Sequence, residues 1–423
     1  MIIPSIDLQG GQAVQLVNGE RLAIEAGDAM PLAETFGRVG PIAVIDLDAA
    51  MGKGSNKEII LRLVKKYRCR VGGGIRDIET AIAWLDAGAE QIIIGTAADV
   101  SFVKQLPRDR VIVALDTRYD EVVVDGWRSG TGARAEERMR ELRDYVSGFL
   151  VTFVESEGLM EGTQLDRIAA LKEAAGDSKL TIAGGVTSAV EIRVLDASGV
   201  DAQVGMALYA GRLTLAAGFS APMTSDRADG LWPTIVVDEF DRALGLCYSN
   251  LTSLEEALTT GTGVYWSRSR GLWRKGESSG ATQELLGVSM DCDRDTLRFR
   301  VRQRGPGFCH LSTRSCFGEL GGIAHLSQRV NERTATAPPG SYTRKLLMND
   351  GLLAAKVVEE AHELVDANTA PEVAAEAADL LYFTLVTLAR HGVGLSDVVR
   401  ILDNRARKVT RRPGLAKSME VST

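Results

Sequence analysis

The first half of the sequence repeats itself, and this repeat limits the possible folds more than any other feature. Three pairs of segments correspond: VGGGIRDIE at 71–79 with IAGGVTSAV at 182–190, GTAAD at 95–99 with GMALY at 205–209, and SID at 5–7 with ALD at 114–116. The offsets between these pairs are 109 to 111 positions. A repeat of this length holds several strand and helix patterns, so it predicts two fused copies of one multi-element structure.

Short β-branched runs alternate with helical patterns from Met1 to about Phe219. The eight runs are MIIPSID, PIAVIDLD, RVGGGI, QIIIGTA, VIVALD, GFLVTFV, LTIAGGV and AQVGMAL. Eight strands with intervening helices are typical of a (β/α)8 barrel. Together with the repeat, they predict a barrel over residues 1–220 that consists of two half-barrels of four units each.

The rest of the chain changes character twice. A polar stretch at 220–230 predicts a linker, and short strand-like runs after it predict a small β-rich (α+β) domain over 225–320. Residues 321–342 read as a second loose connector with a short helix before two prolines. Apolar positions at helical spacing then predict an all-α domain over 338–423.

Composition excludes several classes of protein. A chain of 423 residues is long enough for roughly three domains, and 45% hydrophobic residues can fill several cores. The net charge of −7 argues against a protein that coats nucleic acid. No apolar run approaches the roughly eighteen residues of a membrane span, and MIIPSIDLQGGQ does not resemble a secretory leader, so we expect a cytoplasmic protein without a membrane partner.

Glycines mark the loops after four of the predicted barrel strands. Backbone N–H groups in such turns can hold a phosphate without a basic side chain. The alternative is that these glycines only permit tight turns, but their occurrence in both halves favours two phosphate sites. The candidates are Gly73, Gly74, Gly95, Thr96, Gly184, Gly185 and Gly205.

Two carboxylates occupy equivalent positions in the two halves. Asp7 ends the first predicted strand and Asp116 the fifth, which places them opposite each other at the carboxyl-terminal face of the barrel. Such a pair can act as general base and general acid on one substrate. The alternative is that both are solvated loop residues.

The barrel motifs SIDLQGG, VIDLDAA, VGGGIR, IIIGTAA, ALDTR–DGW, IAGGV and GMALY resemble the half-barrel isomerase of histidine biosynthesis, which converts an aminoaldose ribotide to its ribulosyl form. The resemblance implies Asp7 as base, Asp116 as acid and a role for Thr152. The family usually carries Thr-Asp-x-x-x-Asp-Gly-Thr after strand 6. Here Glu157 replaces the second Asp of that motif and Leu159 its last Thr.

The middle domain contains two groups of candidate metal ligands. Asp291, Asp293 and Asp295 alternate along the chain, and on a strand they would point to one side and suit Mg2+. Three thiols form the core of the other group, a soft ligand set that Zn2+ prefers, with a fourth position open for water unless a neighbouring imidazole fills it. Its members are Cys292, Cys309, Cys316 and His310. Reduced core cysteines or a purely structural zinc remain alternatives.

The surrounding segments SRSRGLWRKGESSG, DCDRD and GFCHLSTRSCFGE resemble phosphoribosyl-AMP cyclohydrolase, which opens the adenine ring. The resemblance implies that the three cysteines bind zinc, contributed by two subunits, that the three aspartates bind magnesium, and that His310 transfers a proton. A basic cluster suits phosphate capture, with a solvated basic face as the alternative. It comprises Arg268, Arg270, Arg274 and Lys275.

The helical region carries two acidic pairs with three-residue spacing. Glu360 and Glu363 form one pair and Glu376 and Asp379 the other, so two antiparallel helices could bring four carboxylates to Mg2+, unless they are a solvated acidic face. SYTRKLL, KVVEEAHEL, EAADLLYF and RARKVTRR resemble phosphoribosyl-ATP pyrophosphohydrolase. The candidate phosphate contacts are Lys356, Arg405 and Lys408, while Arg411 and Arg412 could also be a free tail.

Together these resemblances predict a fusion enzyme for consecutive steps of histidine biosynthesis, acting on phosphoribosyl nucleotides and forming a homodimer or a higher homo-oligomer. One alternative keeps the two hydrolytic activities and makes the barrel a non-catalytic module, because of Glu157 and Leu159. A second alternative is a metal-dependent nucleotide sensor without turnover.

Overall fold

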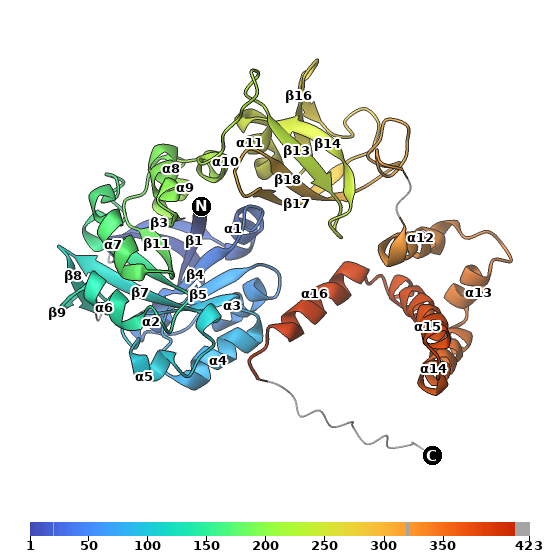
Figure 1. Ribbon diagram of the computed structural model, residues 1–423, viewed down its shortest axis with the longest axis horizontal. Coiled ribbons are helices and arrows are strands. Elements are labelled where there is room, and N and C mark those ends of the chain that lie inside the picture. The colour runs from blue at the N-terminus through green and yellow to red at the C-terminus, as the bar shows by residue number, and fades with distance from the viewer. Residues whose placement is uncertain (20, 125, 319–320, 411–423) are drawn as a thin grey trace. The chain divides into compact units, whose positions relative to one another are not determined.

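The computed structural model describes residues 1–19, 21–124, 126–318 and 321–410 (Figure 1). The chain divides into two compact units. The first contains Met1–Val236, Leu246–Gly305 and the described residues from Arg407 on, and the second contains Val237–Gly245 and Pro306–Ala406. The β-rich region is therefore shared between the units.

Eight parallel strands close into a barrel in the first unit, which confirms the predicted (β/α)8 fold (Figure 1). Their order around the barrel is β1-β4-β5-β6-β7-β10-β11-β12, and β12 pairs with β1 to close the ring. The strands are β1 Ile2–Gln9, β4 Ile42–Asp46, β5 Cys69–Gly72, β6 Gln91–Ile94, β7 Val111–Arg118, β10 Gly148–Phe153, β11 Lys179–Ala183 and β12 Val200–Val204. All eight runs identified in the sequence are barrel strands.

The barrel strands are apolar because both of their faces are covered. Every residue of β5 and β10 is buried, as parallel strands between a helical layer and a barrel interior must be. One cluster inside the barrel takes one side chain from each of β6, β7, β10 and β11. It consists of Ile93, Ile112, Leu150 and Ala183, and Ile45 and Ala114 pack against it.

Polar caps define where the barrel helices begin. Asp77 accepts a hydrogen bond from the Thr80 amide at 2.7 Å and starts α4, which ends at Gly88 in a left-handed conformation. Asp28, Asp99, Ser188 and Thr214 cap α1, α5, α8 and α10 in the same way. The helices are α1 Ala29–Phe36, α2 Leu47–Met51, α3 Lys57–Val64, α4 Ile78–Ala87, α5 Val100–Val103, α6 Ala135–Leu142, α7 Ile168–Ala175, α8 Ala189–Ala197, α9 Met206–Tyr209 and α10 Leu215–Ser220.

Two hairpins extend the barrel sheet, and the sequence patterns did not predict them. Each follows the first strand of a half-barrel: β2 (Gln12–Val17) and β3 (Arg21–Gly27) come after β1, and β8 (Glu121–Val124) and β9 (Ser129–Arg134) come after β7. Tyr119 and its successor have positive φ between β7 and β8, as a two-residue hairpin turn requires. The repeat of the fold therefore includes these hairpins as well as the barrel strands.

The β-rich region forms a four-stranded sheet and a separate hairpin. The sheet order is β14-β13-β18-β17, and β15 pairs with β16. The buried Tyr265 hydroxyl donates to Gln283 at 2.7 Å, and the Tyr265 ring lies 5.3 Å from the ring of Phe299. The elements are β13 Trp232–Val237, β14 Ala243–Ser249, α11 Leu251–Thr260, β15 Val264–Ser267, β16 Gly271–Arg274, β17 Gln283–Met290 and β18 Leu297–Gln303. This region is α+β, as predicted.

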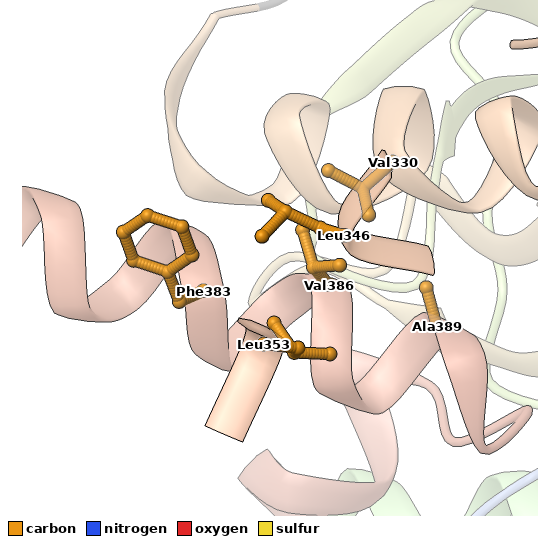
Figure 2. Packing of buried hydrophobic residues seen from close by; sticks show 6 residues of the cluster. All are labelled: Val330, Leu346, Leu353, Phe383, Val386 and Ala389. Carbon is orange, nitrogen blue, oxygen red and sulfur yellow. The ribbon is translucent and has the colours of Figure 1, made fainter. Parts of the chain in front are cut away.

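The second unit contains five helices among its described residues. They are α12 Gly322–Thr336, α13 Tyr342–Met348, α14 Asp350–Asp366, α15 Ala370–Arg390 and α16 Leu395–Ala406. Figure 2 shows side chains from α12 to α15 packed in one core, which comprises Val330, Leu346, Leu353, Phe383, Val386 and Ala389. No helix of the described residues is long and apolar enough to cross a membrane.

The helix expected before the two prolines is present but longer than predicted, so the expectation of a loose connector over 321–342 is wrong for residues 322–336. The α12 helix has 15 residues and buries Ala324, Ser327 and Val330 at three-residue spacing. Val330 contributes to the helical core, so this helix is held by tertiary packing although its sequence is rich in polar residues.

The helical core gives a direct test of this packing. Leu346→Ala should lower the stability of the second unit by about 2–5 kcal/mol, because the fully buried side chain leaves a cavity. Met348→Ala, on the same helix but 78% exposed, should change it by less than about 0.5 kcal/mol. Amide hydrogen exchange in α13 to α15 measures both effects, and equal values for the two variants would contradict the packing described.

Candidate active sites

A cavity of about 900 Å³ opens at the carboxyl-terminal ends of the barrel strands. Asp7 and Asp116 line it from the ends of β1 and β7, as predicted from the repeat. Glu157, which follows β10, also lines it. Three carboxylates therefore share one enclosed space at the face where barrel active sites lie.

Burial shifts the ionisation of all three carboxylates. It raises the pKa of Asp7 to about 7. It raises the pKa of Glu157 to about 8, with further contributions from the charges of Asp7 and Asp116. Burial also raises the pKa of Asp116, although hydrogen bonds from Trp127 and Thr152 oppose the shift. Near neutral pH this cavity holds both protonated and ionised carboxyl groups, as acid–base catalysis requires.

Trp127 connects the two halves of the barrel above the cavity. Its Nε1 donates to Asp116 Oδ2 at 2.7 Å. Its ring lies against Gly19, where an added Cβ would come within 2.4 Å of the ring. Gly19 has φ of +69° and follows β2, whereas Trp127 lies between β8 and β9, so the two equivalent hairpins meet at this contact.

The predicted phosphate glycines have matching surroundings in the two halves. A Cβ on Gly73 would lie 2.2 Å from the carbonyl oxygen of Asp46, and one on Gly184 would lie 2.5 Å from that of Phe153. Both glycines have positive φ, as do Gly74 and Gly185. Only glycine fits these close backbone approaches, so the turns leave N–H groups at the cavity wall.

The other pair of candidate glycines is not equivalent. Gly95 and Thr96 line the cavity, and a Cβ on Gly95 would meet nothing within 4 Å. A Cβ on Gly205 would lie 2.5 Å from Gln15 Oε1 and 2.7 Å from Ser5 Oγ. The second half of the barrel therefore has a tighter loop at this position.

Four basic side chains that the sequence patterns did not identify line the cavity. They are Lys53, Arg76, Arg128 and Arg138. Arg76 donates to the carbonyl oxygen of Ala50 at 2.7 Å, which fixes its side chain beside the loop after β4. These residues lie in loops and helices without a distinctive pattern, so only the fold brings them to the site.

The three aspartates of DCDRD lie in a turn between β17 and β18, and the expected strand geometry is wrong. Asp291 closes this turn because its side chain accepts hydrogen bonds from the amides of Asp295 at 3.1 Å and Thr296 at 3.2 Å. The pKa of Asp291 is lowered overall, because the hydrogen bonds from these amides outweigh the opposite effect of burial. Carboxylate oxygens of Asp291, Asp293 and Asp295 nevertheless lie within 4.8 Å of one another, a spacing suited to one cation.

The predicted zinc ligands are divided between the two units. Cys292 belongs to the first unit, and Cys309, His310 and Cys316 belong to the second. The Cys309 sulfur lies 3.8 Å from His310 Nδ1. Hydrogen bonds, first from the Leu311 amide and also from the Cys316 thiol, lower the pKa of Cys309, which favours the thiolate that zinc binds. The three-thiolate set stays a prediction.

The basic cluster of the β15–β16 hairpin is stacked on aromatic rings. Arg268 lies 4.9 Å from the centre of the Tyr248 ring, and Arg270 and Lys275 lie 5.3 and 5.8 Å from that of Trp273. Arg274 instead forms an ion pair with Glu256 at 2.9 Å. Three of the four cations therefore lie against aromatic rings, which hold their positive charges close together.

Two helices bring the predicted acidic residues together in the second unit. Oxygens of Glu360 on α14 and of Glu376 and Asp379 on α15 lie within 4.8 Å of one another. Burial, and then the charges of Glu360 and Glu376, raise the pKa of Glu363. Glu360 is only 5% exposed and pairs with Lys356 at 3.0 Å, which compensates part of the negative charge of this cluster. This arrangement fits Mg2+.

The predicted phosphate contacts of the helical region have different environments. Lys356 forms ion pairs with Glu359 at 2.8 Å and Glu360 at 3.0 Å, so it lies beside the acidic cluster. Arg405 is exposed on α16, and Lys408 lies close enough to Asp86 to lower the pKa of that carboxyl. Arg405 and Lys408 belong to different units. Arg411 and Arg412 lie outside the described residues.

Three protein families match consecutive parts of the chain. The family described as histidine biosynthesis protein matches residues 1–214. Phosphoribosyl-AMP cyclohydrolase matches residues 245–318, and phosphoribosyl-ATP pyrophosphohydrolase matches residues 323–406. The three resemblances identified in the sequence are thereby confirmed, in the same order.

Similar curated proteins are named as multifunctional proteins of histidine biosynthesis. A histidine biosynthesis trifunctional protein of Neurospora crassa is 39% identical over 374 residues, which are 86% of this chain and 41% of that protein. A histidine biosynthesis bifunctional protein of Schizosaccharomyces pombe is 51% identical over 206 residues, 49% of each chain. One of Synechocystis sp. is 42% identical over 193 residues, 42% of this chain and 90% of that protein. The chain spans less than half the length of the two fungal relatives.

The raised pKa of Glu157 makes the stability of the barrel depend on pH. Folding favours the protonated form of Glu157. The contribution of this group to folding stability is therefore complete below its unfolded pKa of about 4.5 and is lost as the pH rises to about 8. Glu157→Gln should therefore stabilise the barrel by about 5 kcal/mol at pH 9 and by much less at pH 5. Hydrogen exchange of the β7 and β10 amides reports this change.

The exposed Glu161, four positions along the chain, provides the control. Glu161→Gln should give the same stability as the unsubstituted protein at both pH values. A stabilisation by Glu157→Gln that is independent of pH would contradict the shifted pKa.

Proposed function

The chain belongs to the histidine biosynthesis protein family, and we propose that it catalyses three consecutive steps of that pathway. The helical region hydrolyses phosphoribosyl-ATP to phosphoribosyl-AMP and pyrophosphate, the β-rich region opens the adenine ring, and the barrel isomerises the resulting aminoaldose ribotide. The observation that carries the full proposal is the group Asp7, Asp116 and Glu157 in one cavity, because the barrel departs most from its family pattern. Chemical order then runs backward along the chain.

For pyrophosphate release, α14 and α15 supply an oxygen-rich site. Glu360, Glu363, Glu376 and Asp379 would hold Mg2+, which stabilises the developing charge on the leaving pyrophosphate. Lys356 holds Glu360 in place through its ion pair and keeps a positive charge beside the phosphates. The helical core behind these residues keeps the four carboxylates together.

For ring opening, the cysteines supply soft ligands and the aspartate turn supplies hard ones. Cys292, Cys309 and Cys316, contributed by two subunits as the resemblance implies, would hold Zn2+, which would make water a better nucleophile near neutral pH, and Asp291, Asp293 and Asp295 would hold Mg2+. His310 lies beside Cys309 and transfers a proton at its imidazole nitrogen. Arg268, Arg270 and Lys275 bind the substrate phosphate.

For isomerisation, the barrel residues move protons between the ends of one sugar. A carboxyl group protonates the ring oxygen to open the ring, and a carboxylate then removes the proton from carbon 2. Asp7, with a pKa of about 7, suits the base near neutral pH. Asp116 acts as the acid, oriented by Trp127 and Thr152. Glu157, protonated below about pH 8, replaces the shorter Asp of the family as a further proton donor.

We place the protein in the cytoplasm, as a homodimer or higher homo-oligomer that binds small phosphoribosyl nucleotides. The sharing of zinc ligands between two subunits, which the cyclohydrolase resemblance implies, supports the assembly. The glycine turns at Gly73–Gly74 and Gly184–Gly185 support a substrate with a phosphate at each end.

The products formed from phosphoribosyl-ATP test the proposal. The intact chain should convert it through all three steps to the ribulosyl product, as identified by mass spectrometry and isomer-resolving chromatography. Cys309→Ala should stop the sequence at phosphoribosyl-AMP, because the proposed zinc site loses a thiolate. Asp7→Asn should stop it at the aminoaldose.

Each failure has its own meaning. No ribulosyl product from the unsubstituted protein, with Asp7→Asn identical to it, would make the barrel a non-catalytic module. Unchanged ring opening in Cys309→Ala would contradict the zinc assignment, and absence of any turnover would favour a nucleotide sensor.

The acidic cluster predicts a separate effect on pyrophosphate release. Glu376→Gln should reduce the rate at least about 100-fold and raise the Mg2+ concentration needed for half-maximal rate, because a ligand oxygen loses its charge. Glu332→Gln, at an exposed position on α12, should leave both values unchanged. Equal Mg2+ requirements for the two variants would remove this cluster from the proposed site.

A further inference from the structure

The turn that carries the candidate magnesium aspartates also carries an arginine that contacts the barrel. Arg294 lies between Asp293 and Asp295, and its Nη1 lies 2.7 Å from Oδ1 of Asp196. Asp196 lies near the end of barrel helix α8, and its side chain is only 9% exposed. An ion pair with a largely buried carboxylate is more restrictive than one on the surface.

The backbone of Arg294 is also held by a hydrogen bond, from the segment that follows the barrel. Its carbonyl oxygen accepts a hydrogen bond from the Thr224 amide at 2.9 Å. Arg294 has φ of +66°, a left-handed conformation that residues other than glycine seldom adopt. A strained residue persists where its surroundings fix it, and here a side-chain contact and a backbone contact do so from outside the turn.

A movement of Arg294 must move its two neighbours. The Asp291 amide donates to the Thr296 carbonyl at 3.1 Å, and the Asp291 carboxylate accepts from the Asp295 amide. These bonds close the turn, so Asp293 and Asp295 have little freedom apart from that of Arg294.

The barrel also holds the strand that enters this turn. The Arg38 carbonyl, which follows α1, accepts from the Val288 amide of β17 at 2.6 Å. The Arg38 guanidinium donates to the Leu258 carbonyl near the end of α11 at 2.8 Å. Both the strand and the turn are therefore fixed to the same end of the barrel helices.

We propose that Asp196 and Arg294 are positioning residues for ring opening: the barrel, through this ion pair, holds the aspartate turn in the shape that binds a divalent cation. The inference rests on the proposed magnesium role of Asp291, Asp293 and Asp295. It gives the barrel a second task in the chain, separate from the chemistry of its own cavity.

The test measures the turn directly in the full-length chain. Asp196→Asn should speed amide hydrogen exchange at Asp295 and Thr296, because the turn loses its anchor. It should also weaken Mn2+ binding at the turn about tenfold in calorimetric titration. The titrations use a background with Glu360→Gln and Glu376→Gln, so that the helical cluster does not contribute.

Asp201→Asn is the matched control. Asp196 and Asp201 both accept from the Met1 amino group, at 2.9 and 3.0 Å, but the pair with Arg294 involves Asp196. The control should leave exchange and Mn2+ affinity at the turn unchanged. Exchanging the charges with Asp196→Arg and Arg294→Asp should restore part of the loss, and Arg294→Gly, which relieves the strain but removes the ion pair, should not.

The outcomes separate this inference from the proposed function. If Asp293→Asn weakens Mn2+ binding and Asp196→Asn changes neither affinity nor exchange, the positioning role is wrong and the metal role stands. If Asp293→Asn leaves Mn2+ binding unchanged, the metal role of the turn is wrong, and the inference that depends on it is also overturned.

Discussion

Closure of the parallel sheet is the constraint on which the rest of the first unit depends. β10 pairs with β7 in a register that sets Thr152 beside Asp116, and β12 pairs with β1 below Asp7. The pairings of β6 with β7 and of β12 with β1 join the half-barrels, and only in a closed ring do the ends of β1 and β7 face each other across one cavity. The same closure orients the barrel helices outward, so that Asp196 on α8 can reach the aspartate turn.

Carboxylates in this chain serve different purposes because their surroundings differ. Burial in the barrel cavity raises the pKa values of Asp7 and Glu157 and makes them suitable for proton transfer. Backbone amides lower the pKa of Asp291 and keep that group ionised, as a metal ligand should be. Burial and then the neighbouring carboxylates raise the pKa of Glu363, and a bound cation would relieve the repulsion among these carboxylates. The same functional group, a carboxyl, thus supports acid–base chemistry in one region and suits cation binding in two others.

The sequence predicted the features that depend on local pattern. The eight barrel strands contain short apolar, β-branched runs, and Asp7 and Asp116 follow directly from the repeat. The hairpins after β1 and β7 were missed because their strands are short and partly exposed, as in β9. Glu157 was visible as a departure from a family motif, but its membership of the carboxylate group depends on the fold. The turn at Asp291 was also missed. There the Asp291 carboxylate, rather than a backbone carbonyl of a neighbouring strand, accepts hydrogen bonds from two amides.

The contact of Trp127 with Gly19 has a consequence for how the barrel can evolve. Two halves that arise by duplication can at first diverge independently, since each carries its own loops. Here a loop of the first half lies against the aromatic ring that orients Asp116 in the second. Any side chain at position 19 would displace that ring, so a substitution accepted in one half depends on a residue in the other. The two halves are therefore interdependent at this contact, and neither can be replaced by a copy of the other without disturbing it.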